Sequence, residues 1–244
     1  MMTGRFVMLG RMTRRLHTRL GVALVVTAAA TAGSAAAASA ATISTTQACF
    51  VNGANRYAAV VTVTGSGFGP GDDVSIRGAG THGLDLFGDL TADANGNISG
   101  SVGDALLDTD GAVVSTGTIT ATDEGNLDTG ADTGMTATTG VSVTNLAVST
   151  NPSGGKPSRK VKFTFSGFTP GKIIYGHYLH KGRLKLTYAF ARAHGACGTA
   201  VAHARLYPRG RARYNSYTVQ VDSSKRYSKH TQPAFLATLT YTYF

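Results

Sequence analysis

The chain lacks tryptophan, and charged residues make up only 15% of its 244 positions. Acidic residues are scarce in the C-terminal part, where Asp222 is the single one after residue 132. This shortage excludes the paired carboxylates of a glycosidase from that part. The sequence also lacks the Gly-x-Ser-x-Gly elbow, the P-loop, the dinucleotide-binding fingerprint and the His-Glu-x-x-His motif. We therefore expect a protein that is not an enzyme and that needs no cofactor.

The apolar run Leu20–Ala30 is too short to span a bilayer. A basic segment without acidic residues precedes it, and the small residues Ala38-Ser39-Ala40 follow it. This order of basic, apolar and small residues is typical of a secretory signal peptide. We predict that residues 1–41 are a signal peptide and that the protein is secreted to the extracellular space without a transmembrane anchor.

Cysteine is also scarce, because the chain has only Cys49 and Cys197. Export permits disulfide formation, and the two cysteines lie in different halves of the chain. Two interpretations remain open, a disulfide that ties the halves together or two separate buried thiols. A nucleophilic role for Cys197 beside His194 is disfavoured, because nothing else in its glycine-rich segment completes a catalytic site.

Glycine is abundant, and one glycine-containing motif occurs twice. Residues 60–76 read VVTVTGSGFGPGDDVSI and residues 161–175 read VKFTFSGFTPGKIIY. In each copy an alternating apolar and polar run meets Gly-Phe-x-Pro-Gly, and a second apolar run follows. Proline and glycine at these positions are typical of a tight turn, and the alternation is typical of a strand. The motif therefore predicts two strands joined by a corner, once in each half.

These segments, TGSGFGPGDDV and FSGFTPGKII, resemble the opening strands of bacterial immunoglobulin-like repeats, including the IPT/TIG type. The resemblance implies a β-sandwich with a scaffold or binding role, and it carries over no catalytic residues. The predicted fold class is all-β, with two tandem immunoglobulin-like β-sandwich domains after the signal peptide. We place the first domain at residues 42–144 and the second at 145–244.

Formal charge divides between these two predicted domains. From Thr42 to Thr150 the chain has two basic and twelve acidic residues, a net charge of −10. From Asn151 onward it has sixteen basic residues and one acid, a net charge of +15. An acidic domain followed by a strongly basic one suggests an anionic partner for the second domain.

The acidic domain contains one candidate calcium loop. Asp93-Ala94-Asn95-Gly96-Asn97 resembles the start of such a loop, but Ile98 occupies the sixth position, where the loop needs glycine. Asn95-Gly96 between two apolar runs instead favours a two-residue hairpin. We predict the hairpin and no metal site, with calcium as the alternative.

The basic domain supplies the candidate binding residues. Arg209, Arg211 and Arg213 share a face if they form a regular strand, with tyrosines nearby. Basic residues combined with aromatic residues suit a polyanion through charge attraction and stacking. The predicted polyanion-binding residues are Lys160, Lys162, Arg183, Lys185, Arg205, Arg209, Arg211 and Arg213. Two alternatives remain, a solvated face that keeps the protein soluble and a face that docks on the acidic domain.

Five histidines also lie in the basic domain. His177 and His180 have a spacing that suits a metal on a helix, but on a strand these residues point to opposite faces. We therefore expect no metal site here and expect these histidines at the surface or at sheet edges.

Together these observations predict a secreted, non-enzymatic adhesion or binding module. Its basic domain would bind an extracellular polyanion such as a cell-wall glycopolymer, an acidic polysaccharide or nucleic acid. The alternative is a structural scaffold that self-associates through contacts between the acidic and basic domains.

Overall fold

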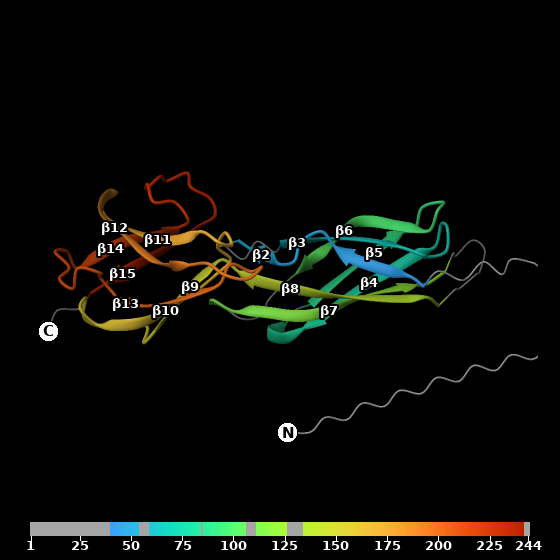
Figure 1. The fold of residues 1–244 in the computed structure, drawn as a ribbon, viewed down its shortest axis with the longest axis horizontal. Coiled ribbons are helices and arrows are strands. Elements are labelled where there is room, and N and C mark those ends of the chain that lie inside the picture. The colour runs from blue at the N-terminus through green and yellow to red at the C-terminus, as the bar shows by residue number, and fades with distance from the viewer. Residues whose placement is uncertain (1–39, 54–58, 84, 106–110, 126–133, 242–244) are drawn as a thin grey trace, which may run out of the picture. The chain divides into compact units, whose positions relative to one another are not determined.

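The structure, a computed structural model, describes residues 40–53, 59–83, 85–105, 111–125 and 134–241 (Figure 1). The predicted signal peptide therefore lies outside the described residues, apart from positions 40 and 41. Within the described part the chain is all-β, with one short 3₁₀ turn, η1 (Thr81–Gly83). The all-β class is confirmed, whereas the number of domains and their immunoglobulin-like type stay predictions.

Strands β1 to β8, which we call the first half, form two sheets. A three-stranded sheet has the order β1-β3-β6, and a five-stranded sheet has the order β2-β8-β7-β4-β5. The strands are β1 (Thr42–Thr45), β2 (Phe50–Asn52), β3 (Ala59–Ser66), β4 (Asp73–Gly80), β5 (Asp85–Thr91), β6 (Asn97–Ala105), β7 (Val114–Asp123) and β8 (Thr136–Asn145).

Strands β9 to β15, the second half, form another two sheets. Their orders are β13-β10-β9 and β12-β11-β14-β15. The strands are β9 (Ala147–Asn151), β10 (Lys160–Ser166), β11 (Ile173–His180), β12 (Arg183–Arg192), β13 (Ala200–Arg205), β14 (Ser216–Asp222) and β15 (Ala234–Thr240).

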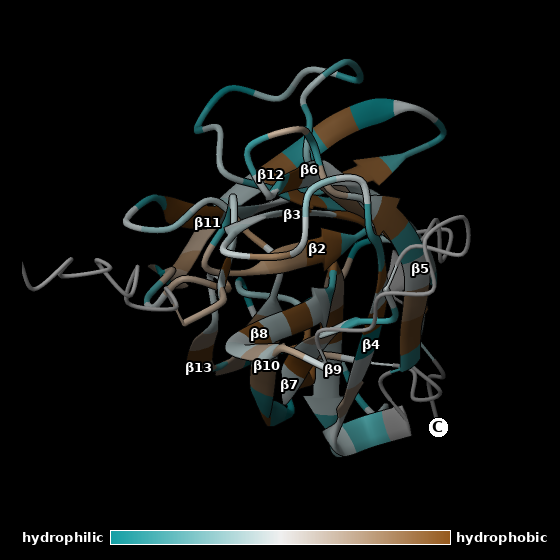
Figure 2. Cartoon of the chain, turned by 90° about the vertical axis from the view of Figure 1, so that its right-hand side faces the viewer, coloured by the Kyte–Doolittle hydropathy of each residue, from teal (hydrophilic) through white to brown (hydrophobic). Residues whose placement is uncertain are grey.

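Apolar residues of each half form a separate buried cluster between its two sheets. In the second half, Val161, Phe163 and Phe165 of β10 point inward and are buried, as their alternation predicts, while Lys160 and Lys162 are exposed. Figure 2 shows hydrophobic and hydrophilic bands alternating along the strands. Burial of these apolar faces is the main favourable contribution to folding.

The duplicated motif forms the predicted corner in both halves. It carries the chain from β3 to β4 and from β10 to β11, so each corner passes from one sheet to the other. The same backbone hydrogen bonds support both corners. The equivalent N···O pairs are Gly71–Ala92 at 3.1 Å and Gly171–Ala193 at 2.9 Å, and Phe68–Gly96 at 3.1 Å and Phe168–Gly198 at 3.3 Å.

A second glycine is needed at each corner, and the sequence motif does not contain it. Gly96 and Gly198 both have positive φ, +73° and +57°, and each lies against the carbonyl oxygen of the corner phenylalanine. A Cβ atom at Gly198 would lie 1.6 Å from the oxygen of Phe168. Only glycine permits both this backbone conformation and this close approach.

The predicted hairpin at Asn95-Gly96 is a tight turn, but it does not join paired strands. β5 belongs to the five-stranded sheet and β6 pairs with β3 in the other sheet, so the hairpin prediction is wrong. Asp93 closes the turn by accepting the backbone N–H groups of Asn95 and Asn97 at 2.8 and 2.9 Å. These bonds, those to Asn97 first, lower the pKa of the Asp93 carboxyl group.

The two cysteines are joined. Cys49 lies directly before β2 and Cys197 lies in the turn between β12 and β13, and they form a disulfide with Cα atoms 5.2 Å apart. The bond closes a sequence separation of 148 residues. It links the N-terminal strands covalently to the second half, within the single compact unit that begins at residue 39.

Candidate functional site

The candidate site is at one end of the second half, where β13 ends and β14 begins. The connecting loop, residues 206–215, is held there by backbone hydrogen bonds to the segment before β10. Leu206 N–H donates to Arg159 at 3.0 Å, and Tyr207 N–H donates to Pro157 at 2.9 Å. The turn between β11 and β12, Lys181-Gly182, lies at this end too, since His180 Nδ1 is 3.1 Å from the carbonyl oxygen of Ser216. We call this region the basic end.

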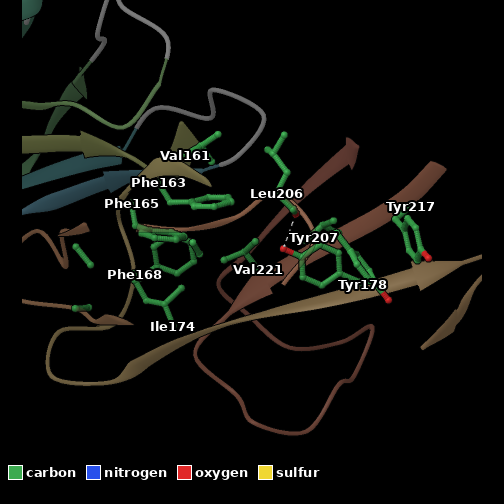
Figure 3. Packing of buried hydrophobic residues seen from close by; sticks show 14 of the residues in the cluster. Val161, Phe163, Phe165, Phe168, Ile174, Tyr178, Leu206, Tyr207, Tyr217 and Val221 are labelled. Carbon is green, nitrogen blue, oxygen red and sulfur yellow. Dashed lines mark hydrogen bonds between the residues drawn. The ribbon is translucent and has the colours of Figure 1, made fainter. Parts of the chain in front are cut away.

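Buried tyrosines form the floor of the basic end (Figure 3). Tyr178 and Tyr207 meet edge to face with ring centroids 5.5 Å apart, and Tyr207 and Tyr217 are 5.0 Å apart. The hydroxyls of Tyr178 and Tyr241 both donate to the carbonyl oxygen of Leu206, at 3.2 and 3.3 Å. The start of the 206–215 loop is therefore fixed from below by aromatic packing and hydrogen bonds.

Burial also determines the protonation of this floor. It raises the pKa of Tyr207 to about 12, and burial together with the neighbouring tyrosines raises the pKa of Tyr178 as well. Both hydroxyls stay neutral at physiological pH. The floor therefore adds no negative charge beneath the cations that surround it.

Cations surround this floor on both sheets. Lys160 lies opposite Arg205 in the β10–β13 register. The guanidinium of Arg205 lies over the turn of the loop, because a Cβ on Gly210 would be 2.6 Å from Arg205 Nη1. On the other sheet, Lys185 Nζ lies 5.5 Å from the centre of the Tyr214 ring, a cation–π geometry.

Tyr214 connects the loop to the second sheet. Its ring stacks on the imidazole of His180 with centroids 3.8 Å apart and planes 2° from parallel. The neighbouring backbone N–H of Arg213 donates to the hydroxyl of Tyr217 at 3.2 Å. These contacts place the C-terminal part of the loop beside Lys185 of β12.

The structure thus brings most of the eight predicted cations to the basic end, but not on one strand face. Lys160, Lys162 and Arg205 lie on the three-stranded sheet, and Arg183 and Lys185 lie on β12 of the other sheet. Lys162 lies two residues further along β10, opposite His203.

The prediction that Arg209, Arg211 and Arg213 share a strand face is wrong. All three are exposed residues of the 206–215 loop, because strand β13 ends at Arg205. The physical cause is a turn in which Gly210, with a φ of +76°, donates its N–H to the carbonyl oxygen of Tyr207 at 2.8 Å. Tyr207, near the start of this loop, is buried.

No carboxylate neutralises the basic end within the described part of the chain. The eight cations form no salt bridge there, and the one acid of the second half, Asp222, is at the opposite end of β14. Asp222 is fully buried with His177, at 3.4 Å from Asp222 Oδ1 to His177 Nε2. The positive charge at the basic end therefore faces solvent.

Sequence reasoning missed the role of His177, and the expectation that it is a surface or edge residue is wrong. Its side chain is fully buried, with Nδ1 3.0 Å from Thr187 Oγ1 and Nε2 3.0 Å from the carbonyl oxygen of Ser224. Burial disfavours the Asp222 carboxylate, but bonds from His177, Gln220 and the Ser224 N–H outweigh it and lower the Asp222 pKa. The cluster holds the segment after β14 against the sheet.

The described residues contain no group of three or more histidine, cysteine or acidic side chains arranged to hold a metal ion. They also contain no helix of the length and hydrophobicity needed to cross a membrane. The carboxylate of Asp93, the first residue of the candidate calcium loop, instead accepts amide N–H groups of Asn95 and Asn97.

Comparison with known proteins gives no family. No family model matches the chain, so its resemblance to IPT/TIG repeats stays a prediction. No curated protein matches it either.

Solved structures that resemble the chain do so weakly. A tetra-tandem repeat from the extending region of a large adhesion protein is 14% identical over 82% of this chain and 48% of its own length, with a TM-score of 0.29. A 1.5-MDa bacterial ice-binding adhesin is 15% identical over 82% of this chain and 62% of its own, with a TM-score of 0.30. The Y1175G mutant of Salmonella alpha-2-macroglobulin is 9% identical over 84% of this chain and 15% of its own length, with a TM-score of 0.27. Likeness at this level assigns no function.

Proposed function

We propose that this protein is a secreted, non-enzymatic binding module whose basic end binds extracellular polyanions. The observation that carries the proposal is the gathering of exposed arginine and lysine side chains around the 206–215 loop, with no carboxylate among the described residues to pair with them. Uncompensated positive charge attracts anionic polymers and releases their counterions on binding.

The geometry favours a linear polymer over a small anion. The cations belong to two sheets and to the loop that connects them, so they form an extended set of separate charges. Arg205 and Lys160 lie on the three-stranded sheet and Lys185 lies on the other sheet, with the loop arginines on the connection between the two sheets. Repeated phosphate, sulfate or carboxylate groups along one polymer suit such an extended set of charges.

Aromatic residues contribute to the same surface. Tyr214 and His180 form a stacked pair that Lys185 contacts, and part of this pair is accessible. Stacked rings beside cations bind sugar or base rings in a sequence-tolerant manner. The site is therefore suited to a polymer with repeating charge and repeating rings, which includes acidic polysaccharides and single-stranded nucleic acid.

The test is binding of fluorescently labelled heparin and of a single-stranded DNA oligonucleotide, measured by anisotropy at low salt. The variant Arg209→Gln/Arg211→Gln/Arg213→Gln removes three charges from the basic end. The matched control Lys225→Gln/Arg226→Gln/Lys229→Gln removes three exposed charges that follow the other end of β14. We expect the first variant to lose about tenfold or more in affinity and the control to change little.

Equal losses in the two variants would show that net charge alone attracts the polymer, and the basic end would not be the site. Absence of binding by the wild-type protein even at low salt would reject polyanion binding altogether. A preference for one of the two probes would identify the class of polymer.

A further inference from the structure

The two halves differ at one sheet edge. Four strands of the larger sheet correspond in order, β8-β7-β4-β5 in the first half and β15-β14-β11-β12 in the second. In the first half a further strand, β2, lies parallel to β8 and pairs with its last three residues, Val143–Asn145. Among the described residues, no strand occupies the equivalent place beside β15.

The two edge strands, β8 and β15, also differ in the burial of their inward residues. The inward residues Ala137, Val141 and Val143 of β8 are at most 6% exposed. The inward residues Phe235 and Leu239 of β15 are only half-buried. They line an apolar cavity of about 130 Å³ together with residues of β9, β10, β11, β12 and β14. The core of the second half is therefore more exposed along β15 than the core of the first half is along β8.

The segment that could fill this place within the chain is unsuited to it. In the first half the covering strand lies between β1 and β3, and the corresponding residues of the second half are 152–159, between β9 and β10. They read PSGGKPSR, with two prolines, two glycines and no large apolar residue. Such a segment does not form an edge strand that closes an apolar core.

Strand β15 also lacks the usual protection of a free edge. Natural edge strands carry charges, prolines or bulges that prevent pairing with another chain. The opposite edge of the same sheet, β12, carries Arg183, Lys185 and Arg192, and its pairing with β11 contains irregularities. β15 reads AFLATLT, has no charge, and exposes 62% of Leu236.

We propose that β15 pairs antiparallel with β15 of a second copy of this chain, giving a closed dimer with one continuous sheet. The sequence is self-complementary around Ala237, since Phe235 then lies opposite Leu239 and Leu236 opposite Thr238 of the other copy. The inward Phe235 and Leu239 of the second copy lie beside the open apolar edge. No charged residue of β15 meets its own counterpart, so the strand pair contains no like-charge contact.

Charge also selects the antiparallel orientation. β15 ends at the basic end, because Thr240 pairs with Ser216, the first residue of β14. A parallel pair would bring two basic ends together, whereas an antiparallel pair separates them along the strand direction. A two-fold symmetric contact of this kind closes after two copies. The dimer does not depend on polyanion binding, and it would present two basic ends that point in opposite directions.

The experiment is sedimentation velocity of the purified protein over a micromolar concentration series at physiological salt. The wild type is expected to be a dimer. Leu236→Lys places a charge in the shared edge and should raise the dimer dissociation constant by about tenfold or more. Leu184→Lys is the matched control, because Leu184 is an exposed leucine, at 45%, on the opposite edge strand of the same sheet.

A second variant tests the register. Leu236→Lys/Thr238→Glu places lysine opposite glutamate of the other copy on both sides of the two-fold axis, and it should restore the dimer. A monomeric wild type, a dimer that Leu236→Lys leaves unchanged, or equal sensitivity to Leu184→Lys would each overturn the proposal. Species larger than a dimer would also overturn it. Melting temperatures of the variants separate loss of pairing from loss of folding.

Discussion

Removal of the disulfide should destabilise the protein strongly, because the bond closes a very long loop. Cys49 and Cys197 are 148 residues apart and both are buried. For a loop of this length, the chain-entropy relation gives a stabilisation of about 5 kcal/mol at 25 °C. Typical domains have an unfolding free energy of only about 5–15 kcal/mol, so this bond would supply a large fraction of the stability.

The perturbation is Cys49→Ser/Cys197→Ser, compared with the wild type in its oxidised and reduced forms. Urea unfolding can be followed by tyrosine fluorescence, since the chain has ten tyrosines and no tryptophan. The oxidised wild type should exceed both other forms by up to about 5 kcal/mol in unfolding free energy. Agreement between the reduced wild type and the double variant would assign the effect to the bond and not to the serine side chains.

A difference below about 1 kcal/mol between oxidised and reduced protein would refute this reasoning. It would mean that unfolding does not release the long loop, as happens when the two halves unfold separately and the segments around each cysteine stay in place. The experiment therefore also reports on the cooperativity between the halves.

Two further predictions concern the fold. Gly198→Ala should destabilise the protein much more than Gly182→Ala in thermal melts: both glycines have positive φ, but only at Gly198 would the new Cβ meet a backbone oxygen. Equal destabilisation by the two substitutions would show that the contact between the new Cβ and the Phe168 oxygen does not determine the loss of stability. The pKa of Asp222 is lower in the folded protein than in the unfolded chain, so its ionised carboxylate stabilises the folded state at pH values above the unfolded-state pKa of about 4. This stabilisation is lost as the pH falls below about 4 and through the lower folded-state pKa. Asp222→Asn should therefore lower the melting temperature at pH 7 and flatten its acid dependence, whereas Asp89→Asn, at an exposed carboxylate of β5, should do neither.

Strand positions could largely be predicted from the sequence, because apolar alternation and glycine turns are local signals. The corner motif, the Lys181-Gly182 turn with both residues at positive φ, and the inward faces of β10 and β14 follow from such signals. Sheet membership could not be predicted in the same way. The Asn95-Gly96 turn has the composition of a hairpin, yet its flanking strands belong to different sheets.

The candidate site was predictable in composition but not in shape. Net charge alone pointed to the second half. The loop position of Arg209, Arg211 and Arg213 follows from the turn at Gly210, and this turn depends on contacts with the tyrosine floor. The burial of His177 depends on the segment after β14, which folds back over it. Such non-local contacts leave no mark in the alternation of a single strand.

Among these tests, the salt dependence of binding to a single-stranded DNA oligonucleotide addresses the role of the basic end most directly. Each phosphate contact contributes a slope of roughly −0.7 to the plot of log affinity against log salt concentration. Arg209→Gln/Arg211→Gln/Arg213→Gln should therefore reduce the magnitude of the slope by about 2 relative to the wild type. An unchanged slope in this variant, or the same reduction in Lys225→Gln/Arg226→Gln/Lys229→Gln, would contradict a polyanion site at the basic end.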